Sequence, residues 1–191
     1  MDYQNMTLKD LQKDLIVEAR KGFPFFLAGT VYWLVMGILY FFIGDQQVLA
    51  LCYLLGTGSI FPLALLLGNL FKLNLLSKNP LGVLGGIVGG IQAFYLPIWI
   101  VIYLENYELL PMVIGVLGAS HFLPYLWIYR SKTYGIFTVG MAVVSFFLGY
   151  VIEGHAFLTL PFILSALYLV TACALIKESK AFITEKENVT M

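Results

Sequence analysis

The sequence predicts an all-α fold, a polytopic membrane bundle of six transmembrane helices arranged as three hairpins and preceded by a short cytoplasmic amphipathic helix. Three observations lead to this prediction. First, 60% of the 191 residues are hydrophobic and only 12% are charged, whereas soluble domains are roughly 45–50% apolar and about 25% charged. Second, six long apolar runs contain no Asp, Glu, Lys or Arg. Third, all eleven basic residues fall on one side of these runs. The composition excludes an ordinary soluble domain, a disordered chain and a nucleic-acid binder.

The first element, residues 1–22, has the pattern of an amphipathic helix. Thr7 and Asp10 have the form of a capping box, with Asp in place of the usual Glu. Apolar residues then recur at helical spacing, with charges between them: Leu8, Leu11, Leu15 and Ala19. We expect a short helix on the membrane surface or under the bundle. A solvated lead-in that only supplies positive charge is the alternative.

The six apolar runs follow, in a transmembrane domain over residues 23–176. A bilayer core of about 30 Å requires around 20 apolar residues per helix, and each run is continuously apolar, unlike the alternating strands of a barrel. The runs are residues 23–43, 48–71, 81–104, 109–129, 134–152 and 156–176. Short connections join them into three hairpins, and residues 177–191 form a polar tail.

Charge placement predicts the direction of the spans. The basic residues stand before the first run, after the second, after the fourth and after the sixth: Lys9, Lys13, Arg20, Lys21, Lys72, Lys78, Arg130, Lys132, Lys177, Lys180 and Lys186. The other connections carry only acidic charges: Asp45, Glu105, Glu108 and Glu153. By the positive-inside rule, both termini are cytoplasmic, and the protein crosses the membrane several times.

The third run opens with five glycines, at positions 82, 85, 86, 89 and 90. Gly82 and Gly86, Gly85 and Gly89, and Gly86 and Gly90 form three overlapping pairs four residues apart, a spacing that lets helix backbones approach closely. We expect a tightly packed central helix with close contact along Gly82, Gly86 and Gly90. A gating helix or a homodimer face is the functional alternative.

His121 is the one imidazole within a span, and ionisable residues in membranes often mark functional sites. We expect it to face the bundle interior and to contact Gln92 first, with Tyr125 on the same helix and Tyr32 and Ser145 at similar depth. These five residues form the candidate ligand or proton site. The alternative is a neutral, sealed histidine that holds a neighbouring polar group.

Proline is expected to interrupt the helix next to His121. Pro124 cannot donate to the helix ladder, so a polar kink is expected there. The segment from Gly118 to Pro124 echoes the segment from Gly56 to Pro62: both run Gly, small, small, polar, apolar, apolar, Pro. The echo indicates either a duplicated hairpin or the general abundance of Gly and Pro in membrane helices.

No metal set, nucleophile motif or cofactor-binding lysine is recognisable within the spans, so we expect no metal, no cofactor and no catalytic residue. An intramembrane enzyme is therefore the least favoured function class. The two leading classes are a small transporter or channel-like protein with a polar site near the midplane, and a scaffold, sensor or partner subunit that docks through the glycine face of the third span. The partners expected are the lipid bilayer and either a second copy or a membrane subunit, and no nucleic acid.

Two stretches carry a resemblance to a known family. Arg20-Lys21-Gly22-Phe23-Pro24-Phe25 leading into Trp33, and the segment from His121 through Pro124 to Arg130, resemble a family of small six-span bacterial membrane proteins that is known only as a domain of unknown function. The resemblance implies a bacterial plasma-membrane protein and brings no activity with it.

Overall fold

The structure, a computed structural model, describes residues 3–152 and 154–190, with side chains through Thr184. Within these residues every regular element is helical, which confirms the predicted all-α fold. The α-helices are α1 Leu8–Ala19, α2 Phe23–Leu39, α3 Gln46–Gly56, α4 Ile60–Leu70, α5 Pro80–Gly90, α6 Leu96–Asn106, α7 Leu110–Ser120, α8 Tyr125–Ile128, α9 Lys132–Phe146 and α10 Thr159–Thr190. The expected outer charge Glu153 and the side chain of Lys186 lie outside the described part.

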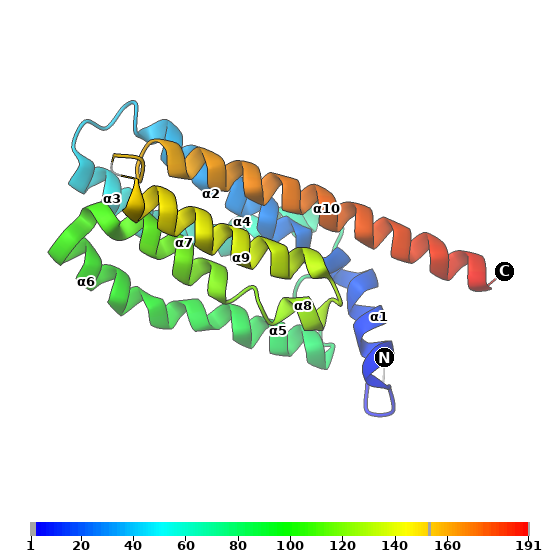
Figure 1. Cartoon of the computed structure of the whole chain (residues 1–191). Helices are drawn as coiled ribbons and strands as arrows, with labels where there is room; N and C mark the ends of the chain where they lie inside the picture. Colours follow the sequence, from blue (N-terminus) through cyan, green and yellow to red (C-terminus); the bar gives the residue numbers. More distant parts are fainter. Residues whose placement is uncertain (1–2, 153, 191) are drawn as a thin grey trace.

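Five helical stretches of the described chain are long and apolar enough to cross a membrane. They are Leu8–Leu39, Gln46–Leu70, Pro80–Ile128, Lys132–Val151 and Thr159–Thr184. The third stretch turns back at Asn106 (φ −156°, ψ 77°), so it forms two antiparallel arms of the bundle (Figure 1). Six arms therefore lie side by side, and the polar residues after Ile176 continue α10 instead of forming a separate tail.

Helix α1 lies across one end of the bundle and packs against it (Figure 1). Thr7 caps the helix as predicted, because its hydroxyl oxygen accepts the backbone N–H of Asp10 at 3.3 Å. Leu15 and Ile16 are buried, each 2% exposed. The Asn79 side chain donates to the Leu11 carbonyl at 2.9 Å, joining α1 to the segment before α5. The helix thus lies under the bundle, and the alternative of a solvated lead-in is wrong.

Three arms lose regular α-helical geometry near the middle of their length. Short 3-10 segments occupy Thr57–Ser59 and Ile91–Tyr95, and turns occupy residues 121–124. Each interruption ends at or a few residues before a proline, namely Pro62, Pro97 or Pro124. A proline removes one backbone donor and clashes with the carbonyl four residues earlier, so the helix tightens or breaks just before it. The predicted kink beside His121 is confirmed, and both halves of the sequence echo coincide with interruptions.

Basic residues end several helices in the left-handed conformation. In the described part of the chain, the non-glycine residues with positive φ are Arg20 (47°), Lys21 (55°), Lys72 (56°) and Arg130 (48°). Glycine usually takes this position after a helix, but a cation there interacts favourably with the negative end of the helix dipole. These helix ends all lie on the basic side of the chain.

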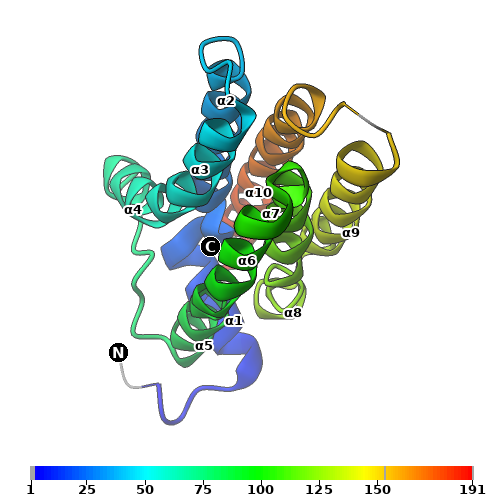
Figure 2. The same ribbon diagram turned by 90° about the vertical axis from the view of Figure 1, so that its left-hand side faces the viewer.

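The core forms where the first and last long helices, α2 and α10, pack along each other. Phe26 of α2 is fully buried, and its ring meets four others at centroid distances of 4.9–5.9 Å. The partners are Phe122, Tyr134, Phe137 and Tyr168. Viewed along the helices, α7 and α10 lie between α4 and α9 (Figure 2). Helix α7 contacts α3, α6, α9 and α10, so it occupies the interior position.

The expectation that the glycine-rich third run is a packed central helix is wrong. In α5 only Leu81 and Gly85 are buried, and large apolar side chains such as Ile87 (64% exposed) point outward. Helix α5 makes contacts with α1 and α8 but is peripheral to the bundle. The glycine content does not by itself specify a partner, because a flat helix face can meet lipid, another helix or a tyrosine side chain.

Candidate functional site

The centre of the candidate site is a side-chain pair between two interrupted helices. The Gln92 amide nitrogen, in the 3-10 segment after α5, lies 2.6 Å from Nε2 of His121, the residue after α7. His121 is 9% exposed. The predicted contact between these two residues is therefore present, although its role as a ligand or proton site stays a prediction.

The second ring nitrogen of His121 has no hydrogen bond. Nδ1 is buried and has no hydrogen bond of normal geometry to a described residue. The backbone carbonyl of Gly118 nevertheless interacts with the imidazole. If the Gln92 amide donates to Nε2, the ring proton must reside on Nδ1. If the amide is reversed, Nε2 carries the proton and Nδ1 presents a buried lone pair. The second arrangement leaves the Nδ1 lone pair buried without a donor, which is rare in folded proteins.

Two further hydrogen bonds flank this pair. Toward the basic end, the Tyr125 hydroxyl donates to the Gly85 carbonyl at 2.5 Å. Toward the opposite end, Tyr95 and Ser120 join their hydroxyls at 2.8 Å. Together with Gln92–His121, they form a polar ladder that fastens α5 and its 3-10 extension to α7 and α8. The sequence could have suggested the bond between Tyr95 and Ser120, since Tyr95 lies one helical turn after Gln92 and Ser120 directly precedes His121.

Tyr32 and Ser145 do not belong to the ladder, which corrects the expectation based on depth. The Tyr32 hydroxyl donates to the Tyr53 carbonyl at 2.9 Å, between α2 and α3. Ser145 packs against Gly115 of α7, whose added Cβ would collide with the serine hydroxyl. Gly115 precedes His121 by six residues, about 9 Å along a helix. Tyr32 and Ser145 have positions along their helices similar to that of His121, but their side chains do not point toward it.

The glycines of α5 separate into two faces. An added Cβ at Gly85 would lie 3.2 Å from the Tyr125 ring, and one at Gly89 would lie 3.3 Å from its hydroxyl. At Gly82 it would meet Leu15 and Ser77 at 3.2 Å. Gly86 and Gly90 have no atom within 4 Å of this position. Close contact therefore runs along Gly82, Gly85 and Gly89, and the expected contact along Gly86 and Gly90 is absent within a single chain.

Two hollows lie at the basic end of the bundle. One of about 130 Å³ lies between Leu65 and Asn69 of α4 and residues 73–76. Another of about 360 Å³ lies between α1 and α8. Neither is lined by Gln92 or His121. No three His, Cys, Asp or Glu side chains group as metal ligands in the part of the chain that the structure describes.

A second polar cluster at the basic end was not expected from the sequence. The Lys21 ammonium lies 2.6 Å from Glu178 of α10, and Ser131 donates to the same carboxylate at 2.6 Å. Thr133 donates to its other oxygen. Tyr134 adds a bond of 2.6 Å to the Lys21 carbonyl. These partners are 45–157 residues apart, so no local pattern could have revealed them.

This fold defines an all-helical protein with several helices apolar and long enough to cross a membrane. The chain belongs to a family of unknown function, DUF7010, whose profile matches residues 8–178. The predicted resemblance to a family of unknown function is thereby confirmed, while its bacterial and six-span character stays a prediction. No curated protein and no solved structure matches the chain.

Proposed function

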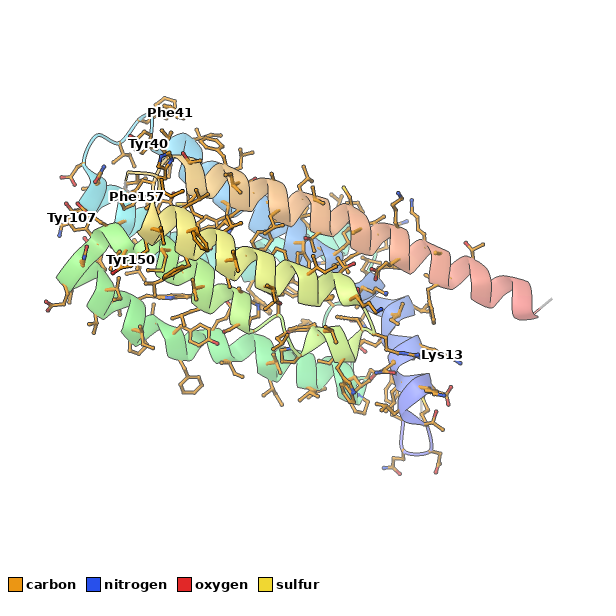
Figure 3. All side chains as sticks on the ribbon, viewed as in Figure 1. Lys13, Tyr40, Phe41, Tyr107, Tyr150 and Phe157 are labelled. Atoms are coloured by element: carbon orange, nitrogen blue, oxygen red, sulfur yellow. The ribbon has the colours of Figure 1, made fainter. Side chains whose placement is uncertain are left out.

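We propose that the chain is a six-span membrane protein with both termini on the cytoplasmic side. Large apolar side chains point outward from the bundle, for example Phe94 (80% exposed) and Ile136 (74%), as a lipid environment requires. Both termini lie at one end of the bundle, where α1 and Lys13 are found (Figures 1 and 3). Aromatic side chains gather at the other end (Figure 3), and the tyrosines among them suit an interfacial belt, which in membrane proteins is rich in Trp and Tyr: Tyr40, Tyr107 and Tyr150.

Reporter fusions test this orientation. A phosphatase that is active only outside the cytoplasm should stay silent when it is fused to the C-terminus. The same reporter fused after Gly44, in the first acidic connection, should be active and serves as the matched control. A strong signal from the C-terminal fusion would contradict the orientation derived from the basic residues.

We further propose that the protein is a small transporter or channel-like protein in which Gln92 and His121 form a proton-responsive site. The observation that carries this proposal is a buried imidazole hydrogen-bonded across two interrupted helices. Transporter sites commonly form where helices are broken near the bilayer midplane. An unperturbed imidazole changes its charge between about pH 5 and 8.

Unpartnered polar atoms around α7 support the same proposal. Within the described residues, Tyr53 Oη, Trp99 Nε1, Ser145 Oγ and His121 Nδ1 are buried and have no hydrogen bond. The first three belong to α3, α6 and α9, three of the four α-helices that contact α7. Such atoms are stabilised when water or a ligand reaches them. Access to His121 in turn requires α5 and α6 to move away from α7, with rupture of the polar ladder.

Proton flux in vesicles tests the role of His121. Purified protein in phosphatidylcholine vesicles that enclose a pH-sensitive dye should dissipate an imposed pH gradient faster than empty vesicles. His121→Ala should abolish this flux and lower the free energy of unfolding by only about 1 kcal/mol, the net value of one hydrogen bond. His155→Ala is the matched control, because the second histidine bonds to Thr159 at the start of α10.

The same experiment separates transport from a structural role. Flux that persists in His121→Ala would contradict the site, and wild-type flux equal to that of empty vesicles would contradict the proposal. A large loss of stability without any wild-type flux would assign the histidine to packing.

A docking protein is the second candidate, and the open face at Gly86 and Gly90 favours it. Helices in lipid associate through such small residues. Replacement of Gly86 by leucine should leave a single chain intact but abolish a dimer or complex that is assembled through this face. Size-exclusion chromatography coupled to light scattering distinguishes the two species, and an assembly that survives Gly86→Leu would contradict docking here.

A further inference from the structure

The larger hollow at the basic end combines apolar and cationic walls. It opens between α1 and α8 with a volume of about 360 Å³, within the range of small-molecule sites. Its lining residues are Leu8, Lys9, Gln12, Leu126, Trp127 and Arg130. The three large apolar side chains are 39–50% exposed. The hollow therefore offers a partly apolar wall beside two positive charges.

Neither cation of the hollow forms an ion pair with an acid in the part of the chain that the structure describes. The ion pair that the structure records among the described residues joins Lys21 to Glu178, away from the hollow's lining. Asp10, the acid next to Lys9, accepts a hydrogen bond of 2.6 Å from Thr7. The positive charge of Lys9 and Arg130 is thus available to an anion.

The backbone holds this hollow in a defined shape. Buried Gln12 donates to the Trp127 carbonyl at 2.9 Å and ties α1 to α8. Arg130 follows α8 with φ +48°, and the next N–H, of Ser131, bonds to the Leu126 carbonyl at 3.0 Å. This is the Schellman arrangement, in which glycine normally takes the left-handed position. The end of α8 therefore places an arginine side chain at the rim of the hollow, where the usual glycine would have no side chain.

We propose that this hollow binds an anionic glycerophospholipid of the inner leaflet. The phosphate lies between Lys9 and Arg130, while the glycerol and the first acyl carbons contact Leu8, Leu126 and Trp127. Basic pockets at helix ends on the cytoplasmic side suit such headgroups, and tryptophan favours the membrane interface. A free phosphate would leave the apolar wall in water, so charge and apolar surface together favour a lipid. The inference rests on the proposed membrane placement but not on transport.

Tryptophan quenching in the full-length protein tests the proposal. The chain has three tryptophans, of which Trp33 and Trp99 are buried and Trp127 is 50% exposed. In phosphatidylcholine vesicles, brominated phosphatidylglycerol should quench the fluorescence more than the same fraction of brominated phosphatidylcholine. Trp127→Phe should remove this difference and so assign it to the hollow.

Charge variants then locate the headgroup. Lys9→Gln and Arg130→Gln should each weaken the apparent affinity for phosphatidylglycerol by about fivefold, the usual effect of one cation near an anionic leaflet. Lys132→Gln makes the same change in net charge two residues from Arg130 and outside the hollow, so it should keep wild-type affinity. Arg130→Gly relaxes the left-handed position, so this variant should fold and still show the same weakening of affinity.

Three results would overturn the assignment. They are equal quenching by the two brominated lipids, an equal loss of affinity in Lys132→Gln, and full competition by water-soluble glycerol 3-phosphate, which would identify a free-phosphate site. A lipid preference that persists while proton flux is absent would contradict transport alone and leave the lipid site intact.

Discussion

Replacement of Gly29 by alanine is expected to destabilise the protein by about 3 kcal/mol, and replacement by leucine to prevent folding. An added Cβ would lie 2.3 Å from Cε1 of Tyr168, across the interface between α2 and α10. The tyrosine ring cannot swing away, because it packs against Phe137 at 4.7 Å and Phe26 at 5.9 Å between ring centroids. Thermal unfolding in detergent measures the loss.

Gly86 provides the matched control for this prediction. It has no atom within 4 Å of an added Cβ, so Gly86→Ala should cost nothing and should gain up to about 1 kcal/mol in helix propensity. Equal losses at both glycines would contradict the packing of α2 on α10. The close contact along Gly86 that the sequence predicts does not agree with this open face.

Removal of the Glu178 carboxylate is expected to have the second large effect, a loss of about 3 kcal/mol in the free energy of unfolding. The Lys21 side chain is only 8% exposed and would keep its charge without a partner. Ser131 and Thr133 would also lose their acceptor. Glu178→Ala should show this loss in chemical unfolding, whereas Glu105→Ala, an exposed acid on the opposite side, should change stability by less than about 0.5 kcal/mol.

The same cluster predicts a dependence on acid. Burial raises the pKa of Glu178, but the hydrogen bonds from Lys21, Ser131 and Thr133 outweigh this effect and hold the pKa below its ordinary value of 4.5. The carboxylate therefore contributes stability above about pH 4.5, and the contribution is lost as the pH falls through the lowered pKa. Glu178→Gln should flatten the stability profile in this range. An unchanged acid limb in that variant would contradict the assignment.

Local sequence rules account for the elements of the fold. Apolar runs identified the long helices, Thr7 identified the start of α1, and Pro124 identified the kink beside His121. Each signal acts within a few residues, through helical hydrogen bonding or the missing proline N–H. The Gln92–His121 contact was also predictable, because buried polar groups in an apolar chain need one another.

The same rules did not identify the partners of each helix face. Tyr32 and Ser145 have the depth of His121 but face other helices, and Gly85 and Gly89 of α5 meet a tyrosine side chain instead of a neighbouring helix backbone. The apolar residues of these helices occur on all sides, so amphipathic spacing marks no inner face. The fit between side chains of neighbouring helices decided which residues each helix face contacts.

By itself, the sequence determined that the chain is all-helical, where the long helices lie, which connections carry the basic residues, and that Gln92 and His121 meet. Only the tertiary structure decided that α7 is central and α5 peripheral, that α2 packs along α10, and that Glu178 neutralises Lys21. The physical reason is the distance along the sequence over which each kind of interaction acts. Helix formation and helix ends depend on residues within about one turn, whereas packing depends on the complementary shapes of side chains that are more than a hundred residues apart.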